Sequence, residues 1–306
     1  MFSKPKRISR RRFLARSFQA AVGVFAAASL SSCTFLQAGP TGKPGSKIQF
    51  GLVTYQLAET WDLPTLISNC EKTKVLGVEL RNTHAHGVEP TLNDQQRRDV
   101  KKRFEDSPVK LLGLGGKLVL DAPDPAGLKK DIETIKSYIV LSHDVGGGGM
   151  RIMPNKFHDG VPHEKTIEQI GKSLNELGQF AADHGQQMRL EVHGDMAELP
   201  TFKSIMDIAT HPNVFVCWNS NPDDLKGKGL EYNFNLVKDR FGSTAHVQPL
   251  DSANYPCQEL LRLFVKADYN GWLCLEGGGK AQDRVKMLAD QRVLFDKMLV
   301  IAQASV

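Results

Sequence analysis

The sequence has few cysteines, and those that it has are far apart. Five cysteines occur in 306 residues, and no two of them form a C-x-x-C pair. Zinc knuckles need such closely spaced pairs, so the pattern argues against a structural zinc site of that kind. Cys70, Cys217, Cys257 and Cys274 are expected to be small buried hydrophobic residues instead.

Acidic residues are absent from positions 1–33, which hold seven lysines and arginines. Removing these seven from the 39 basic residues leaves 32 against 34 acidic residues, so the rest of the chain is close to neutral. A body without a basic surplus is not expected to bind nucleic acid.

The basic first segment resembles an export signal. Ser9–Leu14 has the pattern of a twin-arginine signal, an apolar run follows from Ala20 to Leu30, and Leu30–Cys33 resembles a bacterial lipobox. We expect residues 1–33 to be this signal, Cys33 to be lipidated, and the protein to be exported to the periplasm or cell envelope, meeting the membrane only through the lipid. A plain cleaved leader and a transmembrane anchor are the alternatives. Residues 34–46, rich in glycine and proline, are expected to be a flexible tether.

The body, residues 47–306, alternates short apolar runs rich in β-branched residues with longer stretches at helical spacing. Such strand–helix units predict a (β/α)8 TIM barrel. An open doubly wound sheet is the runner-up, but the first strand lacks the glycine-rich phosphate turn that this fold uses. No break in composition divides the body. The eight expected strands are Ile48–Tyr55, Val75–Arg81, Val109–Gly113, Met150–Pro154, Met188–His193, Val214–Asn219, Thr244–Pro249 and Trp272–Glu276.

Four consecutive strands end in residues that can bind a metal. Glu191, Asn219, His246 and Glu276 lie at or near the ends of the last four expected strands, and barrel enzymes act at this end of their strands. Two carboxylates, an imidazole and an amide oxygen suit one divalent cation such as Mn²⁺, Mg²⁺, Co²⁺ or Zn²⁺. A metal can polarise the oxygens of a sugar while carboxylates move protons on and off carbon.

The order of these four residues resembles that in the sugar isomerase/epimerase superfamily of xylose-isomerase-like barrels. Short segments such as Gly77–Arg81 and Gly271–Leu273 resemble those of its exported bacterial members. The resemblance implies that Glu191 and Glu276 bind the metal and transfer the protons. It also implies that His246 is the third ligand. The family's aspartate falls on Asn219, which has no charge, so metal affinity is expected to be lower. Pro222 and Ser252 stand where the family often has a substrate-binding histidine and arginine.

Other polar residues near the strand ends have two interpretations each. They are candidate substrate contacts, but each could serve the structure alone, in an ion pair, a buried histidine or an aromatic packing contact. The candidates are His193, Glu79, His84, Trp218 and Arg151.

Three functions remain open from the sequence. The first is a metal-dependent sugar isomerase or epimerase, which we favour, acting on a neutral sugar because a phosphorylated one is less natural outside the cytoplasm. The second is a related sugar lyase or dehydratase that uses the same carboxylates. The third is a non-catalytic carbohydrate-binding protein of the cell envelope, which the uncharged Asn219 suggests.

Overall fold

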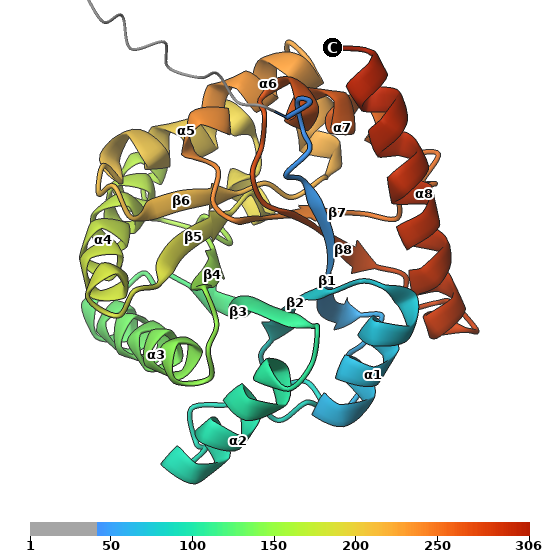
Figure 1. Cartoon of the computed structure of the whole chain (residues 1–306). Coiled ribbons are helices and arrows are strands. Elements are labelled where there is room, and N and C mark those ends of the chain that lie inside the picture. The colour runs from blue at the N-terminus through green and yellow to red at the C-terminus, as the bar shows by residue number, and fades with distance from the viewer. Residues whose placement is uncertain (1–41) are drawn as a thin grey trace, which may run out of the picture. The chain divides into compact units, whose positions relative to one another are not determined.

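Eight parallel strands surrounded by eight α-helices form a (β/α)8 TIM barrel in the computed structural model, which describes residues 42–306 (Figure 1). This confirms the predicted fold. The strands are β1 (Gln49–Gln56), β2 (Gly77–Arg81), β3 (Lys110–Val119), β4 (Gly149–Met153), β5 (Gln187–Glu191), β6 (Val214–Cys217), β7 (Thr244–Val247) and β8 (Trp272–Gly277). The helices are α1 (Leu63–Thr73), α2 (Asp94–Glu105), α3 (Pro125–Asp144), α4 (His163–Asp183), α5 (Leu199–Ile208), α6 (Leu230–Val237), α7 (Cys257–Lys266) and α8 (Arg284–Ala304).

The sheet runs in the order β6-β5-β4-β3-β2-β1-β8-β7. The ring closes between β6 and β7 through two isolated parallel bridges, one of which joins Asn219 to His246. The backbone N–H of His246 donates to Trp218 O at 2.6 Å across this seam. The closure therefore places two of the four candidate metal ligands next to each other.

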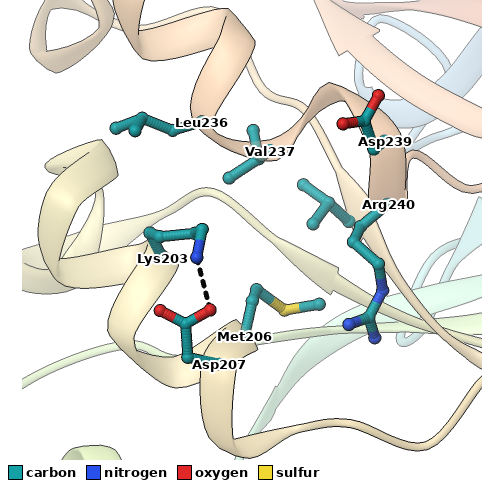
Figure 2. A pocket seen from close by; sticks show the side chains of 8 residues that line it. Lys203, Met206, Asp207, Leu236, Val237, Asp239 and Arg240 are labelled. Carbon is teal, nitrogen blue, oxygen red and sulfur yellow. Dashed lines mark hydrogen bonds and ion pairs between the residues drawn. The ribbon is translucent and has the colours of Figure 1, made fainter.

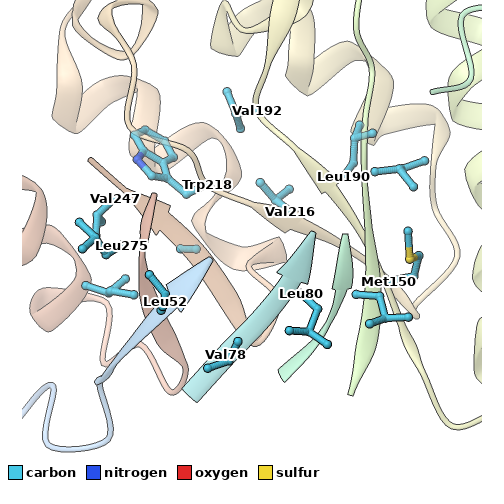
Figure 3. Packing of buried hydrophobic residues seen from close by; sticks show 14 of the residues in the cluster. Leu52, Val78, Leu80, Met150, Leu190, Val192, Val216, Trp218, Val247 and Leu275 are labelled. Carbon is cyan, nitrogen blue, oxygen red and sulfur yellow. The ribbon is translucent and has the colours of Figure 1, made fainter. Parts of the chain in front are cut away.

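Side chains alternate between the inside of the barrel and the layer beneath the helices, as a strand's period of two requires. Val78 and Leu80 of β2 are fully buried in the hydrophobic core, together with apolar residues of the other strands (Figure 3). Glu79, which lies between them, points to the inside and contacts His246. The inside of this barrel thus carries charge, whereas the outer layer is apolar.

The third strand is longer than the sequence indicated. Val109–Gly113 was expected, but β3 continues to Val119 and includes Gly113, Gly115 and Gly116. Glycine weakens a strand pattern, which is why the prediction stopped there. In the structure a Cβ atom on Gly115 would lie 2.7 Å from Arg151 Nε, so this glycine leaves room for a buried arginine.

Three short 3₁₀ helices lie in the loops after β5 and β6 and after α6: η1 (Gly194–Met196), η2 (Pro222–Leu225) and η3 (Lys238–Arg240). Within residues 42–306, no helix is both long and apolar enough to cross a bilayer. The predicted export signal at 1–33, including Cys33, lies outside the described residues, as does most of the predicted tether at 34–46. These assignments stay predictions.

Candidate functional site

The carboxyl ends of β5, β7 and β8 bring Glu191, His246 and Glu276 together. One ligand atom from each of these residues lies within 4.8 Å of the other two. His246 Nδ1 is 3.4 Å from Glu191 Oε1 and 3.7 Å from Glu276 Oε2. The predicted convergence of the strand ends is therefore found for these three residues.

His246 is held in a defined orientation from below by Glu79 of β2. The imidazole Nε2 donates to Glu79 Oε1 at 3.2 Å, and Thr244 Oγ1 donates to Glu79 Oε2 at 3.1 Å. Because a carboxylate only accepts, the Nε2 proton is fixed and Nδ1 is the atom that faces the carboxylates of the site. His246 Nδ1 is buried and has no hydrogen-bond partner among the described residues.

A fully buried arginine ties Glu79 to Glu191. Arg151 of β4 is 1% exposed. Its Nε donates to Glu79 Oε1 at 3.0 Å, and its Nη1 lies 2.8 Å from Glu191 Oε2. Arg151 Nη2 is buried without a hydrogen-bond partner in the described part of the chain. The ion pairs leave Glu191 Oε1 as the oxygen of this carboxylate that faces His246.

A second buried arginine, Arg189 of β5, lies deeper in the barrel. Its Nη1 donates to Thr244 Oγ1 at 2.6 Å and lies 4.0 Å from Glu79 Oε2. A Cβ atom on Gly113 would lie 2.4 Å from Arg189 Nη2, so β3 again leaves room for a guanidinium. We did not predict Arg189 as part of the site. The available signal was an arginine in the middle of an apolar strand, combined with glycines in a neighbouring one.

The buried charges determine one another's protonation. Burial alone would raise the pKa of Glu79, but His246, Arg151 and Arg189 hold that pKa well below its usual range. Burial also opposes ionisation of Glu191, yet Arg151 and His246 lower its pKa to about 2. Burial would lower the pKa of His246, but Cys217, Glu79 and Glu276 raise it well above its ordinary value. Without a metal ion, a proton therefore supplies positive charge between the carboxylates.

Asn219 lies beside Glu191 at the end of β6. Its Nδ2 donates to Glu191 Oε1 at 2.7 Å, and its own backbone oxygen accepts from Asn221 Nδ2 at 2.8 Å. The predicted fourth ligand is thus next to the other three, but it presents an N–H group to the shared carboxylate. Its amide oxygen would have to turn toward the site to act as a ligand.

Two predicted substrate contacts lie below or outside the mouth of the barrel. Glu79 is 0% exposed and engaged by His246, Thr244 and Arg151, so the structure assigns it to the support of His246. Trp218, which Figure 3 shows among the buried hydrophobic residues, is also 0% exposed. Its ring centre lies 5.6 Å from that of Phe234 in the outer layer. Its side chain follows the outward direction of the strand, away from a ligand at the mouth.

Arg151, a third predicted contact, is the buried arginine that pairs with Glu79 and Glu191. The remaining two predicted contacts lie nearer the mouth. His193 is exposed and precedes η1, in an extended conformation just beyond the end of β5. His84 is half-buried in the loop after β2, where its Nδ1 is 2.9 Å from Thr54 Oγ1. Burial and the charge of Arg81 lower the pKa of His84 to about 4, so this imidazole is neutral at neutral pH.

The donor set fits a divalent cation. Two carboxylates and an unpartnered imidazole nitrogen converge. The other nitrogen of the imidazole donates a hydrogen bond to a carboxylate, as in metal-binding histidines generally. A cation at this place would displace the proton of His246, because metal binding requires the neutral imidazole. Glu191, His246 and Glu276 are the residues that would hold it.

A separate hollow of about 170 Å³ lies on the outer side of the barrel, among α5, α6, β6 and η3 (Figure 2). Four of its eight lining residues are apolar and four are charged, and of the latter Lys203 pairs with Asp207. Arg240 at its edge donates to the carbonyls of Ala209 and Val214 at 2.9 and 2.6 Å, so its guanidinium fastens two loops. The hollow lacks the converging acid–base groups of the barrel mouth.

Comparison with known proteins agrees with this architecture. The family model described as xylose isomerase-like TIM barrel matches residues 67–221, half of the chain. No curated protein matches the chain by sequence.

Solved structures share the fold at low sequence identity. An L-ribulose 3-epimerase superposes with a TM-score of 0.72 at 13% identity, covering 84% of this chain and 96% of that one. A D-psicose 3-epimerase with D-tagatose, from Clostridium cellulolyticum H10, gives 0.68 at 15%, covering 83% and 99%. The IOLI protein with a bound zinc atom gives 0.67 at 17%, covering 85% and 98%. Identities at this level establish the shared fold alone.

Proposed function

Because the chain belongs to the xylose isomerase-like TIM barrel family, we propose that it is a divalent-metal-dependent isomerase or epimerase of a small sugar. One observation carries the proposal: Glu191 and Glu276 converge on the unpartnered Nδ1 of His246 at the carboxyl end of the strands. The epimerase function of the structural neighbours agrees with it.

The two carboxylates differ in access. The side chain of Glu276 is 17% exposed, whereas that of Glu191 is 1% exposed and ion-paired with Arg151. Glu276 is therefore the carboxylate that reaches the substrate and accepts the proton from the carbon next to the carbonyl. Glu191, placed on the other side of His246, is the second group available for proton transfer.

The supporting residues keep this geometry. A divalent cation, when bound, would polarise the carbonyl and hydroxyl oxygens of the substrate. Glu79 keeps the proton of His246 on Nε2, so that Nδ1 faces the site. Arg151 pairs with Oε2 of Glu191, so that Oε1, which also accepts from Asn219, is the oxygen that faces His246. Each carboxylate thus has a fixed task before substrate arrives, which lowers the reorganisation that the reaction requires.

Exchange of a carbon-bound proton tests this function. Metal-loaded protein in deuterated water should place deuterium next to the carbonyl of at least one keto- or aldo-sugar, as seen by NMR. Glu276→Gln should abolish the exchange. Glu259→Gln, on α7 with its carboxylate paired to Arg262, is the matched control and should retain it. An eliminated product in place of an isomer would identify a lyase, and no exchange with any sugar would contradict the proposal.

A non-catalytic carbohydrate-binding protein is the second candidate, and Asn219 is the observation that favours it. Its uncharged amide donates to Glu191 Oε1 where a third carboxylate would strengthen cation binding. If Asn219→Asp creates tight Mn²⁺ binding and proton exchange that the unaltered protein lacks, the binding function is correct. If the unaltered protein already exchanges protons, the protein is an enzyme and the binding function is wrong.

We also propose that residues 1–33 direct export and that Cys33 carries a lipid. The motifs Ser9–Leu14 and Leu30–Cys33 support this. In a bacterium that expresses the full chain, Arg10→Lys with Arg11→Lys should retain the protein in the cytoplasm. Cys33→Ala should release it from the membrane fraction. A distribution that neither change alters would overturn the proposal.

A further inference from the structure

Arg81 closes β2 two residues after Glu79, so both residues face the inside of the barrel and Arg81 lies nearer the mouth. Its guanidinium is held in place from two sides. The Cζ atom lies 4.8 Å from the centre of the Tyr55 ring, and Nη1 lies 3.3 Å from His84 Nε2. The backbone N–H of Arg81 donates to Thr54 Oγ1 at 2.9 Å. Arg81 is thus a half-buried arginine with a defined orientation.

The charge of Arg81 has no counterion in the described part of the chain. Within residues 42–306, no carboxylate lies within 4.0 Å of its guanidinium, whereas Arg97, Arg151 and Arg262 each pair with one. Its polar neighbour His84 is a neutral imidazole. A planar guanidinium that is oriented by an aromatic ring but lacks an anion is suited to bind a carboxylate or phosphate of a ligand.

The neighbouring strand carries no side chain at the position paired with Arg81. Its partner on β3 is Gly115, and a Cβ atom there would lie 2.7 Å from Arg151 Nη2. That nitrogen is the buried donor that lacks a partner. The Arg151 guanidinium therefore fills the place of a side chain at Gly115, and it adds a second positive charge beneath Arg81.

On the other side of Arg81, strand β1 separates it from the acid–base site. β1 pairs with β2 and with β8, and the ladder to β8 ends at Gly277, next to Glu276. Adjacent strands are about 4.8 Å apart, so the ends of β2 and β8 lie roughly 10 Å apart. A small sugar can span this distance.

We propose that Arg81 is a subsite for an anionic group of the substrate, so that the protein acts on a sugar that carries a carboxylate or a phosphate. This inference rests on the proposed sugar function and deepens it. It departs from the neutral sugar expected from the sequence, because an oriented and uncompensated guanidinium binds an anionic oxygen more strongly than a neutral hydroxyl oxygen. The acidic end of the substrate would lie on Arg81, and its carbonyl end beside Glu276.

Calorimetric binding to metal-free protein tests the subsite independently of turnover. The probes share one sugar frame: D-glucose, D-glucuronate and D-glucose 6-phosphate, with inorganic phosphate as a fourth. The wild type should bind at least one acidic sugar about tenfold or more tightly than D-glucose, the gain expected for one charge-assisted hydrogen-bonded contact. A preference for glucuronate alone identifies a carboxylate ligand, and one for glucose 6-phosphate alone a phosphate ligand.

The preference should fall to about unity in Arg81→Gln. It should survive in part in Arg81→Lys, which keeps the charge, and fully in Arg98→Gln, a matched change of an exposed arginine on α2. The ratio of the two affinities separates recognition from a purely structural role of Arg81. If the role were structural, the substitution would weaken the binding of all sugars alike. Absence of an acidic preference in the wild type, or its persistence in Arg81→Gln, overturns the inference. A failure of proton exchange would leave these binding results standing, so the two proposals fail separately.

Discussion

Replacing Arg151 by methionine is expected to destabilise the protein strongly. Methionine fills the space of the aliphatic stem but removes the cation that pairs with Glu79 and Glu191, at 3.0 and 2.8 Å respectively. Both carboxylates are fully enclosed, so they would remain buried without their counterion. Removing one partner of a buried ion pair typically costs about 3–5 kcal/mol. That is a large part of the roughly 5–15 kcal/mol by which a domain is stable.

Thermal and urea unfolding of the metal-free protein at pH 7 would measure this loss. For a domain of this size, each kcal/mol lowers Tm by about 2–4 °C, so a decrease of roughly 6–20 °C is expected. Arg98→Met, on the exposed face of α2, should change stability by less than about 0.5 kcal/mol. An Arg151→Met protein as stable as the wild type would refute the view that this arginine neutralises buried carboxylates.

The pH dependence gives a second check on Arg151. The folded-state pKa of Glu191 is lowered to about 2, below its value in an unfolded chain. Its contribution to stability is therefore present above about pH 4.3 and is lost as the pH falls through about 2. Without Arg151, the carboxylates take up protons more easily. The stability difference between Arg151→Met and the wild type should consequently shrink as the pH is lowered from 7, and a constant difference would contradict the electrostatic explanation.

Further substitutions probe the support of the site and a second buried acid. Glu79→Gln should weaken Mn²⁺ binding by about 10–100-fold, measured by calorimetry, because it removes the carboxylate behind His246; unchanged affinity would contradict that role. Gly115→Ala should cost about 1–3 kcal/mol in urea unfolding, because its Cβ would lie 2.7 Å from Arg151 Nε. Burial raises the pKa of Asp224 to about 7. The contribution of this residue to the free energy of unfolding is therefore complete below about pH 4. It is lost, by up to about 4 kcal/mol, as the pH rises through 7. Asp224→Asn should remove that slope in unfolding measured between pH 4 and 9.

The barrel and three of its strand-end residues could be predicted from the sequence because both follow from local patterns. Alternation of short apolar runs with helical stretches gives the strand–helix order, and parallel strands bring their carboxyl ends to one face. Glu191, His246 and Glu276 stand at the ends of such runs, so their convergence follows from the fold. The predicted end of the fifth strand at His193 was two residues too late, since the strand ends at Glu191.

The charged interior could not be predicted in the same way. Arg189 and Glu79 stand in the middle of apolar strands, and their partners are on strands far away in the sequence, so no local pattern links them. The glycines of β3 were interpreted as the end of a strand, although they make space for the guanidinium groups of Arg151 and Arg189. For Trp218 the sequence left stacking on a sugar and aromatic packing open, and strand alternation, which turns neighbouring side chains to opposite sides, favours packing.

Metal content measured by elemental analysis tests the central claim most directly, namely that Glu191, His246 and Glu276 form one cation site. Protein purified in the presence of Mn²⁺ and then freed of loosely bound ions should retain one divalent metal per chain. Glu259→Gln should retain the same amount, whereas Glu276→Gln should lose most of it. Absence of stoichiometric metal from the wild type, or equal retention by Glu276→Gln, would contradict the account.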